Sequence, residues 1–147
     1  MRLPRTLAGM LAAAAIGFTA SAAFGHGDVL PQAVDTTGLD PVGEEWAEEN
    51  PYRLMGGAQY ELAVQIGSSG YNQNCARCHG LEVKSGGLAP DLRFMDDGID
   101  GDEWFLERIR KGYSQNGAYK MPPFQEILSQ EAMWAIRSYV ETRPEDE

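Results

Sequence analysis

Cys75-Ala76-Arg77-Cys78-His79 is the stretch that decides how this chain folds. Both cysteines of the 147-residue chain and one of its two histidines fall within these five residues. Cysteines at this spacing also occur in redox-active dithiols, but such a motif needs no histidine in the next position and usually follows a strand. A structural zinc site would need a second pair of ligands, and the sequence offers only one further histidine.

The pentapeptide predicts covalent attachment of haem. Two thiols three residues apart on one helical turn can reach the two vinyl groups at the edge of a porphyrin, and the adjacent histidine then directs its imidazole at the iron. We therefore predict one haem c, bound covalently through Cys75 and Cys78, with His79 as an axial ligand of the iron. A thiol–disulfide oxidoreductase remains the alternative interpretation of the two cysteines.

The second axial ligand must come from another part of the chain. A methionine thioether raises the reduction potential of haem iron and suits an electron carrier. Met121 opens the sequence Met-Pro-Pro-Phe, whose prolines stiffen the loop and keep Met121 extended, so that its sulfur can project inward. Met133 is typical of a helix core, while Met55 and Met95 lie in a Gly-rich joint and an acidic loop. We predict Met121 as the ligand; an open distal site, for gas sensing or peroxidase activity, is the alternative.

Three segments around the motif have the apolar periodicity of helices, at residues 58–74, 103–111 and 130–142. In the first helix, Leu62 and Ile66 and, around the face, Tyr71 and Cys75 mark the expected buried side. Asp102 is the expected N-cap of the second helix, and Ser129 is that of the third. No pair of alternating strands is found, so we predict an all-α protein with three main helices and long loops.

Residues 1–25 show the three-part pattern of a secretory signal peptide. Arg2 and Arg5 form a positive start, an apolar run follows at 7–18, and small residues then suit a signal peptidase. The apolar run is too short for a stable membrane anchor, although an uncleaved anchor remains the alternative. We expect cleavage just before His26, which then lies at a solvated chain end, and a periplasmic protein without stable membrane insertion.

The remaining residues divide into three zones. Residues 26–55 form an acidic, irregular N-terminal extension rich in proline and glycine, residues 56–142 form the haem domain, and residues 143–147 form an acidic tail.

The net charge of −10 argues against a nucleic-acid partner, because phosphate contacts need clustered cations.

The few cations of the haem domain are unevenly placed. Arg77 and Lys84 flank the haem motif, and Lys120 precedes the methionine loop. A docking patch for a redox partner could therefore be locally basic on an acidic protein. Scattered surface cations are the alternative.

An acidic run precedes the second predicted helix. Asp96, Asp100, Gly101 and Glu107 would match positions of an EF-hand calcium loop, but Gly98 stands where a further carboxylate is required, and no entering helix precedes the run. A solvated acidic loop that caps the second helix is therefore favoured over a calcium site.

These residues resemble the class I cytochromes c, across about 56–142. Gly67, Tyr71 and Cys75 fall at four-residue steps, and in that family a glycine and an aromatic residue at such steps form the crossing of the first and last helices. Ile136 and Tyr139 look like the other half of this crossing. The resemblance implies a class I cytochrome c fold, in which three main helices and loops wrap around one covalently attached haem.

Two further residues are candidates for haem binding. Pro90, eleven residues after His79, looks like the family's proline whose carbonyl accepts the N–H of the proximal imidazole, although a simple turn proline is the alternative. Trp104 either donates its indole N–H to a haem propionate or packs at the start of the second helix.

A narrower resemblance covers nearly the whole chain after the leader. His-Gly-Asp-Val at 26–29, Val-Asp-Thr-Thr-Gly-Leu-Asp-Pro at 34–41, Asn-Pro-Tyr-Arg at 50–53 and the stretches at 71–81 and 129–137 resemble PedF-type periplasmic cytochromes. The resemblance implies a monomeric electron carrier rather than an enzyme. Its donor would be a pyrroloquinoline-quinone (PQQ) dependent alcohol dehydrogenase, and its acceptor a terminal oxidase or another cytochrome.

Overall fold

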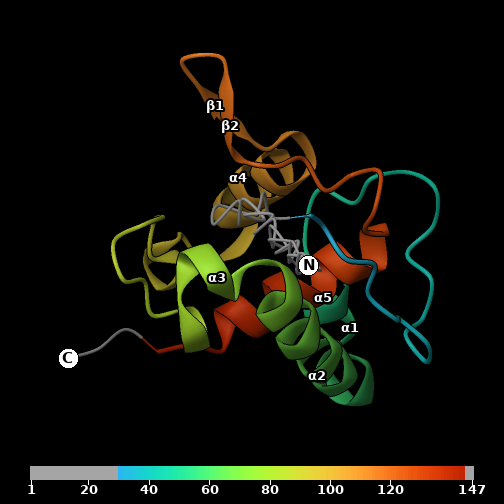
Figure 1. The fold of residues 1–147 in the computed structure, drawn as a ribbon. Helices are drawn as coiled ribbons and strands as arrows, with labels where there is room; N and C mark the ends of the chain where they lie inside the picture. Colours follow the sequence, from blue (N-terminus) through green and yellow to red (C-terminus); the bar gives the residue numbers. More distant parts are fainter. Residues whose placement is uncertain (1–29, 145–147) are drawn as a thin grey trace, which may run out of the picture.

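Local capping and glycine positions set where the helices begin and end. The computed structural model describes residues 30–144 (Figure 1), so the predicted signal peptide and the last residues of the tail lie outside the described residues. Within that range there are five α-helices, two short 3-10 turns and one two-stranded sheet. The elements are α1 (Pro51–Met55), α2 (Gly57–Asn74), α3 (Ala76–His79), η1 (Leu81–Val83), η2 (Leu92–Phe94), α4 (Gly98–Lys111), β1 (Tyr113–Gln115), β2 (Ala118–Met121) and α5 (Gln130–Glu141).

The centre of the molecule is the crossing of α2 and α5, which lie against each other in Figure 1. A Cβ atom placed on Gly67 would lie 1.8 Å from the carbonyl oxygen of Ala135, so only glycine allows the two backbones to approach this closely. The rings of Tyr71 and Tyr139 pack with centroids 5.4 Å apart at 50°. The predicted crossing of the first and last helices is confirmed.

The N-terminal extension runs across α2 and α5 and is fastened there by side chains of the helices. The backbone N–H of Gln32 donates to Asn74 Oδ1 at 2.7 Å, and the N–H of Ala47 donates to Gln130 Oε1 at 2.7 Å. Amide side chains thus satisfy backbone groups that an irregular segment cannot pair with itself. The described part of the segment is irregular from Leu30 to Asn50, and its last five residues form α1.

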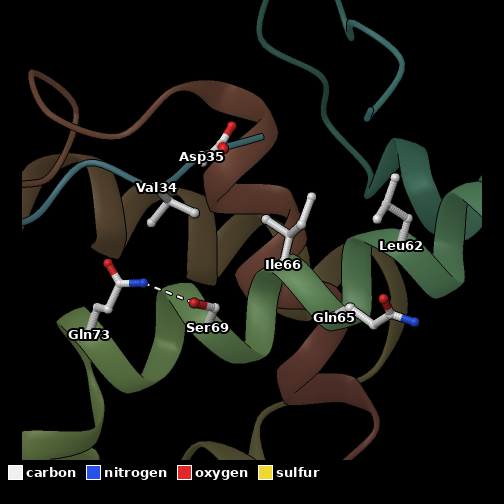
Figure 2. A pocket seen from close by; sticks show the side chains of 7 residues that line it. All are labelled: Val34, Asp35, Leu62, Gln65, Ile66, Ser69 and Gln73. Atoms are coloured by element: carbon white, nitrogen blue, oxygen red, sulfur yellow. Dashed lines mark hydrogen bonds between the residues drawn. The ribbon is translucent and has the colours of Figure 1, made fainter. Parts of the chain in front are cut away.

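The extension also changes which face of α2 is buried. Val34 of the extension lines a groove together with Leu62 and Ile66 of α2 (Figure 2). The volume of this groove is about 270 Å³. Leu62 and Ile66 are half-buried beneath the extension, whereas the face against α5 is made of small residues and Tyr71. The large apolar residues predicted to face the core therefore face the extension, because the close helix crossing has room only for small side chains.

Helix α4 begins at Gly98, five residues before the predicted start. Asp97 occupies the N-cap position, without a capping side-chain hydrogen bond, so the prediction that Asp102 is the N-cap is wrong. The Asp102 side chain is fully buried and accepts hydrogen bonds from Arg137 and Arg53. Long-range ion pairing, rather than capping, determines the role of this residue.

A hairpin follows α4 and departs from the strictly all-α, three-helix prediction. Strands β1 and β2 pair antiparallel, with Tyr113 opposite Met121, and project from the helical body in Figure 1. Asn116 and Gly117 have φ values of 52° and 78°, the left-handed pair that a tight hairpin turn requires. The strands show no apolar alternation, because nearly all of their residues are exposed, and periodicity therefore could not reveal them.

No helix within residues 30–144 is long and apolar enough to cross a membrane.

Candidate metal centre

The two cysteines lie at the junction of α2 and α3. The N–H of Cys75 closes the last turn of α2 on Tyr71 O at 2.8 Å, and the N–H of Cys78 donates back to Cys75 O at 3.0 Å. Both thiols are therefore held within one helical turn, and neither forms a disulfide. Burial, with a smaller contribution from Cys78, raises the pKa of the Cys75 thiol to about 12, whereas reactive dithiols have a lowered pKa.

His79 ends the same turn and is held by a backbone carbonyl. Its Nδ1 lies 2.8 Å from the carbonyl oxygen of Pro90, in the arrangement that the family resemblance implies. A carbonyl can only accept, so Nδ1 carries the proton and Nε2 keeps its lone pair for a metal. Two unpaired thiols and an oriented imidazole on one turn fit the covalent attachment and axial ligation of haem.

A sharp reversal after His79 brings the chain back toward it. A Cβ on Gly80, whose φ is 85°, would lie 1.8 Å from Lys84 O, so the chain folds tightly onto this glycine. Tyr71 Oη donates to Gly80 O at 2.8 Å and fixes the reversal to α2. Val83, fully buried, has φ 68°, which is rare for a β-branched residue. No periodic pattern in the sequence predicts this reversal, and its one local signal is the glycine directly after the motif.

A groove of about 350 Å³ opens beside the histidine's anchor. Pro90 and Trp104, both predicted as haem-binding residues, line the same groove. Trp104 is 42% exposed, and the guanidinium of Arg108 lies 5.6 Å from its ring centroid. The structure therefore brings together two candidates separated by a loop and nearly two helical turns. The groove is also lined by Met95, Asp96, Asp100 and Gly101, which were considered above for other roles, and by three residues without a predicted role, namely Asp91, Leu92 and Phe94.

Met121 lies at the base of the hairpin, at the end of β2. It is half-buried and packs against the hydrophobic core, as does Met95 in the loop before α4. Met133 is fully buried in α5, which agrees with its interpretation as a core residue. Met95 and Met121 are thus both half-buried against the core, and of the two only Met121 is followed by the stiffening prolines.

The acidic loop does not assemble a calcium site. No group of three or more His, Cys, Asp or Glu side chains within residues 30–144 is placed to hold a metal ion. The loop instead becomes the first turn of α4, and its last carboxylate, that of Asp102, points into the protein.

Comparisons with known proteins show cytochromes among the relatives of this chain. The family model described as cytochrome c oxidase, cbb3-type, subunit III matches residues 62–140. A cytochrome c550 of Pseudomonas aeruginosa is 54% identical over 147 residues, covering 100% of both chains. The quinohemoprotein alcohol dehydrogenase ADH IIB of Pseudomonas putida is 38% identical over 80 residues, which are 54% of this chain and 11% of that protein. Quinohemoprotein alcohol dehydrogenase ADH-IIG of the same species is 30% identical over 84 residues. No solved structure matches.

Proposed function

Because this chain belongs to the class I c-type cytochromes, an electron-transfer family, we propose that it is a one-electron carrier whose single haem is held by Cys75, Cys78 and His79. The observation that carries the proposal is the geometry of one turn. Two unpaired thiols precede an imidazole on the same turn, and the Nδ1 of this imidazole is held by Pro90 O. Nε2 is therefore available for iron. When bound, haem supplies a reversible couple between ferrous and ferric iron.

The chain's own residues have separate tasks in this proposal. Cys75 and Cys78 would tether the porphyrin edge by thioether bonds, which fixes the haem relative to α3. The Pro90 carbonyl fixes the orientation of the His79 ring and raises its basicity as a ligand. Met121 would fill the second axial position, so that no substrate can reach the iron, and Trp104 would donate its indole N–H to a propionate.

We further propose that the electron donor is a PQQ-dependent alcohol dehydrogenase in the periplasm. The proposal is supported by two relatives, the quinohemoprotein alcohol dehydrogenases ADH IIB and ADH-IIG, each of which contains a segment similar to about half of this chain. A cytochrome of this kind therefore occurs in the same polypeptide as alcohol oxidation. The acceptor would be a terminal oxidase or another cytochrome. The predicted signal peptide would direct export to the periplasm, where the protein would act as a monomer.

Stopped-flow reduction tests the carrier and its donor together. The protein is matured in a haem-competent periplasm, oxidised, and mixed with a PQQ alcohol dehydrogenase that has been reduced by its alcohol. We expect haem reduction in a single exponential phase whose rate rises with dehydrogenase concentration, while the alcohol alone causes no reduction.

Two results would count against the proposal in different ways. Reduction by ascorbate but not by any dehydrogenase would remove the donor and keep the carrier. A ferric protein without the weak red charge-transfer band of methionine-ligated haem, and with rapid azide binding, would indicate an open distal site.

A further inference from the structure

We propose that Gly112 is a positioning residue that determines where Met121 presents its sulfur to the iron. The inference rests on the proposed axial role of Met121. Gly112 ends α4 with φ 70°, and a Cβ on it would lie 2.5 Å from Met121 O and 2.8 Å from Pro122 C and Pro123 N. The missing side chain therefore lets residues 121–123 cross directly over the end of α4.

The crossing is anchored on both sides. Before it, the register of the hairpin places Met121 opposite Tyr113, the residue that follows Gly112. After it, the N–H of Phe124 donates to Ile109 O at 3.0 Å, and the Phe124 side chain is only 2% exposed. The segment from Met121 to Phe124 is thus held against the last turn of α4 at three successive points. A displacement at Gly112 must therefore be passed on to Met121.

Rearrangement of a side chain cannot absorb this contact. The atoms that a Cβ at position 112 would meet belong to the backbone of Met121, Pro122 and Pro123, and proline fixes its own φ. Restoring an ordinary carbon–oxygen separation requires a displacement of roughly 1 Å. A shift of this size in Met121 is enough to weaken the proposed bond between its sulfur and the iron, because the strength of that bond depends on geometry.

Gly117, in the turn of the hairpin, provides a control for positive φ. It has φ 78°, close to that of Gly112, but a Cβ at position 117 meets no atom within 4 Å. Alanine is strained at either position because φ is positive, and at position 112 the ψ of −165° adds to the strain. Only alanine at position 112 also pushes on Met121, so Gly117→Ala controls for the positive φ, and Phe124→Leu tests the crossing without any backbone strain.

The experiment compares Gly112→Ala, Gly117→Ala and Met121→Leu as holo-proteins. The ferric charge-transfer band, the midpoint potential and exogenous imidazole binding are measured beside thermal unfolding. We expect Gly112→Ala to lose most of the band, to have a lowered potential, and to bind imidazole about tenfold more tightly, because the methionine is displaced in more of the molecules. Gly117→Ala should keep the band, the potential and the imidazole affinity of the parent protein while losing some stability.

The remaining outcomes each overturn a specific statement. If Gly112→Ala and Gly117→Ala both keep the band, or both lose it, Gly112 has no special role in positioning. If Met121→Leu keeps the band, Met121 is not the ligand, and the axial assignment fails before the positioning proposal is reached. Should Gly112→Ala not accumulate as folded protein, Phe124→Leu loosens the same crossing from its other anchor, and an unchanged band and imidazole affinity there overturn the inference.

Discussion

Asp102 shows how partners distant in the chain decide what one residue does. Its carboxylate has no solvent exposure and accepts hydrogen bonds from Arg137 Nε at 2.8 Å, from Arg53, and from the N–H of Asn50 at 2.8 Å. It therefore links the segment before α1 with α4 and α5. Burial alone would raise the pKa of Asp102, but the hydrogen bonds from Arg53, Arg137 and Asn50 together hold that pKa below its usual value.

We predict that Asp102→Asn destabilises the fold by about 3–5 kcal/mol, because it leaves two arginines facing a neutral partner in a buried site. The pH dependence follows from the lowered pKa of Asp102. A carboxyl whose folded pKa lies below its unfolded value stabilises the protein above about pH 4, and this contribution is lost as the pH falls through the folded pKa. Denaturant unfolding between pH 7 and pH 2 should therefore show a flatter acid limb for Asp102→Asn than for the parent protein.

Asp100→Asn provides the control, since Asp100 is an exposed residue of the same helix. It should unfold within about 0.5 kcal/mol of the parent protein. If Asp102→Asn and Asp100→Asn unfold at the same midpoint, the buried ion pairs of Asp102 contribute nothing specific to the free energy of unfolding.

At the scale of elements, the crossing of α2 and α5 determines the geometry of the haem-binding segments. Tyr71 belongs to α2, packs on Tyr139 of α5, and donates its hydroxyl to Gly80 O directly after the motif. The same helix ends at Cys75. The crossing therefore positions both the thiols and the reversal that returns the chain to the histidine.

We predict that Gly67→Ala destabilises the protein by about 3 kcal/mol, at the upper end of overpacking costs, because the added methyl group would lie 1.8 Å from the carbonyl oxygen of Ala135. The contact is between two backbones, so the helices themselves must move apart. Guanidinium unfolding followed by circular dichroism measures the loss. Gly86→Ala, at a position where a Cβ meets nothing within 4 Å, should leave the midpoint nearly unchanged, and equal midpoints for the two variants would contradict the close crossing.

Whole-molecule charge sets the conditions for docking. The chain carries a net charge of −10, and the proposed docking patch consists of the cations Arg77, Lys84 and Lys120 beside the haem-binding segments. Exposed charges separated by more than about 10 Å are largely screened at 0.1 M salt, so only cations close to the partner steer the encounter. An acidic protein can therefore present a basic docking face to its donor.

We predict that the rate of haem reduction by the dehydrogenase falls with ionic strength, and that Lys84→Glu and Lys120→Glu combined abolish this dependence. Stopped-flow measurements across a salt series test the prediction. Lys111→Glu reverses one cation, half the charge change of the double variant, on the exposed face of α4, where Lys111 pairs with Glu107. If the double variant keeps the dependence of the rate on ionic strength, or if Lys111→Glu loses it equally, the docking patch is contradicted.

The sequence by itself determined the haem motif and the apolar periodicity of three helices, because each depends on neighbours within one or two turns, whereas the crossing of α2 and α5 at Gly67 was implied by the family resemblance. Only the tertiary structure decided that Asp102 is buried rather than capping, that the extension covers Leu62 and Ile66, and that Gly112 lies beneath Met121. Those roles depend on contacts between residues far apart in the chain, whose partners no local pattern specifies. A buried carboxylate or a bare glycine looks the same in sequence whichever segment later packs against it.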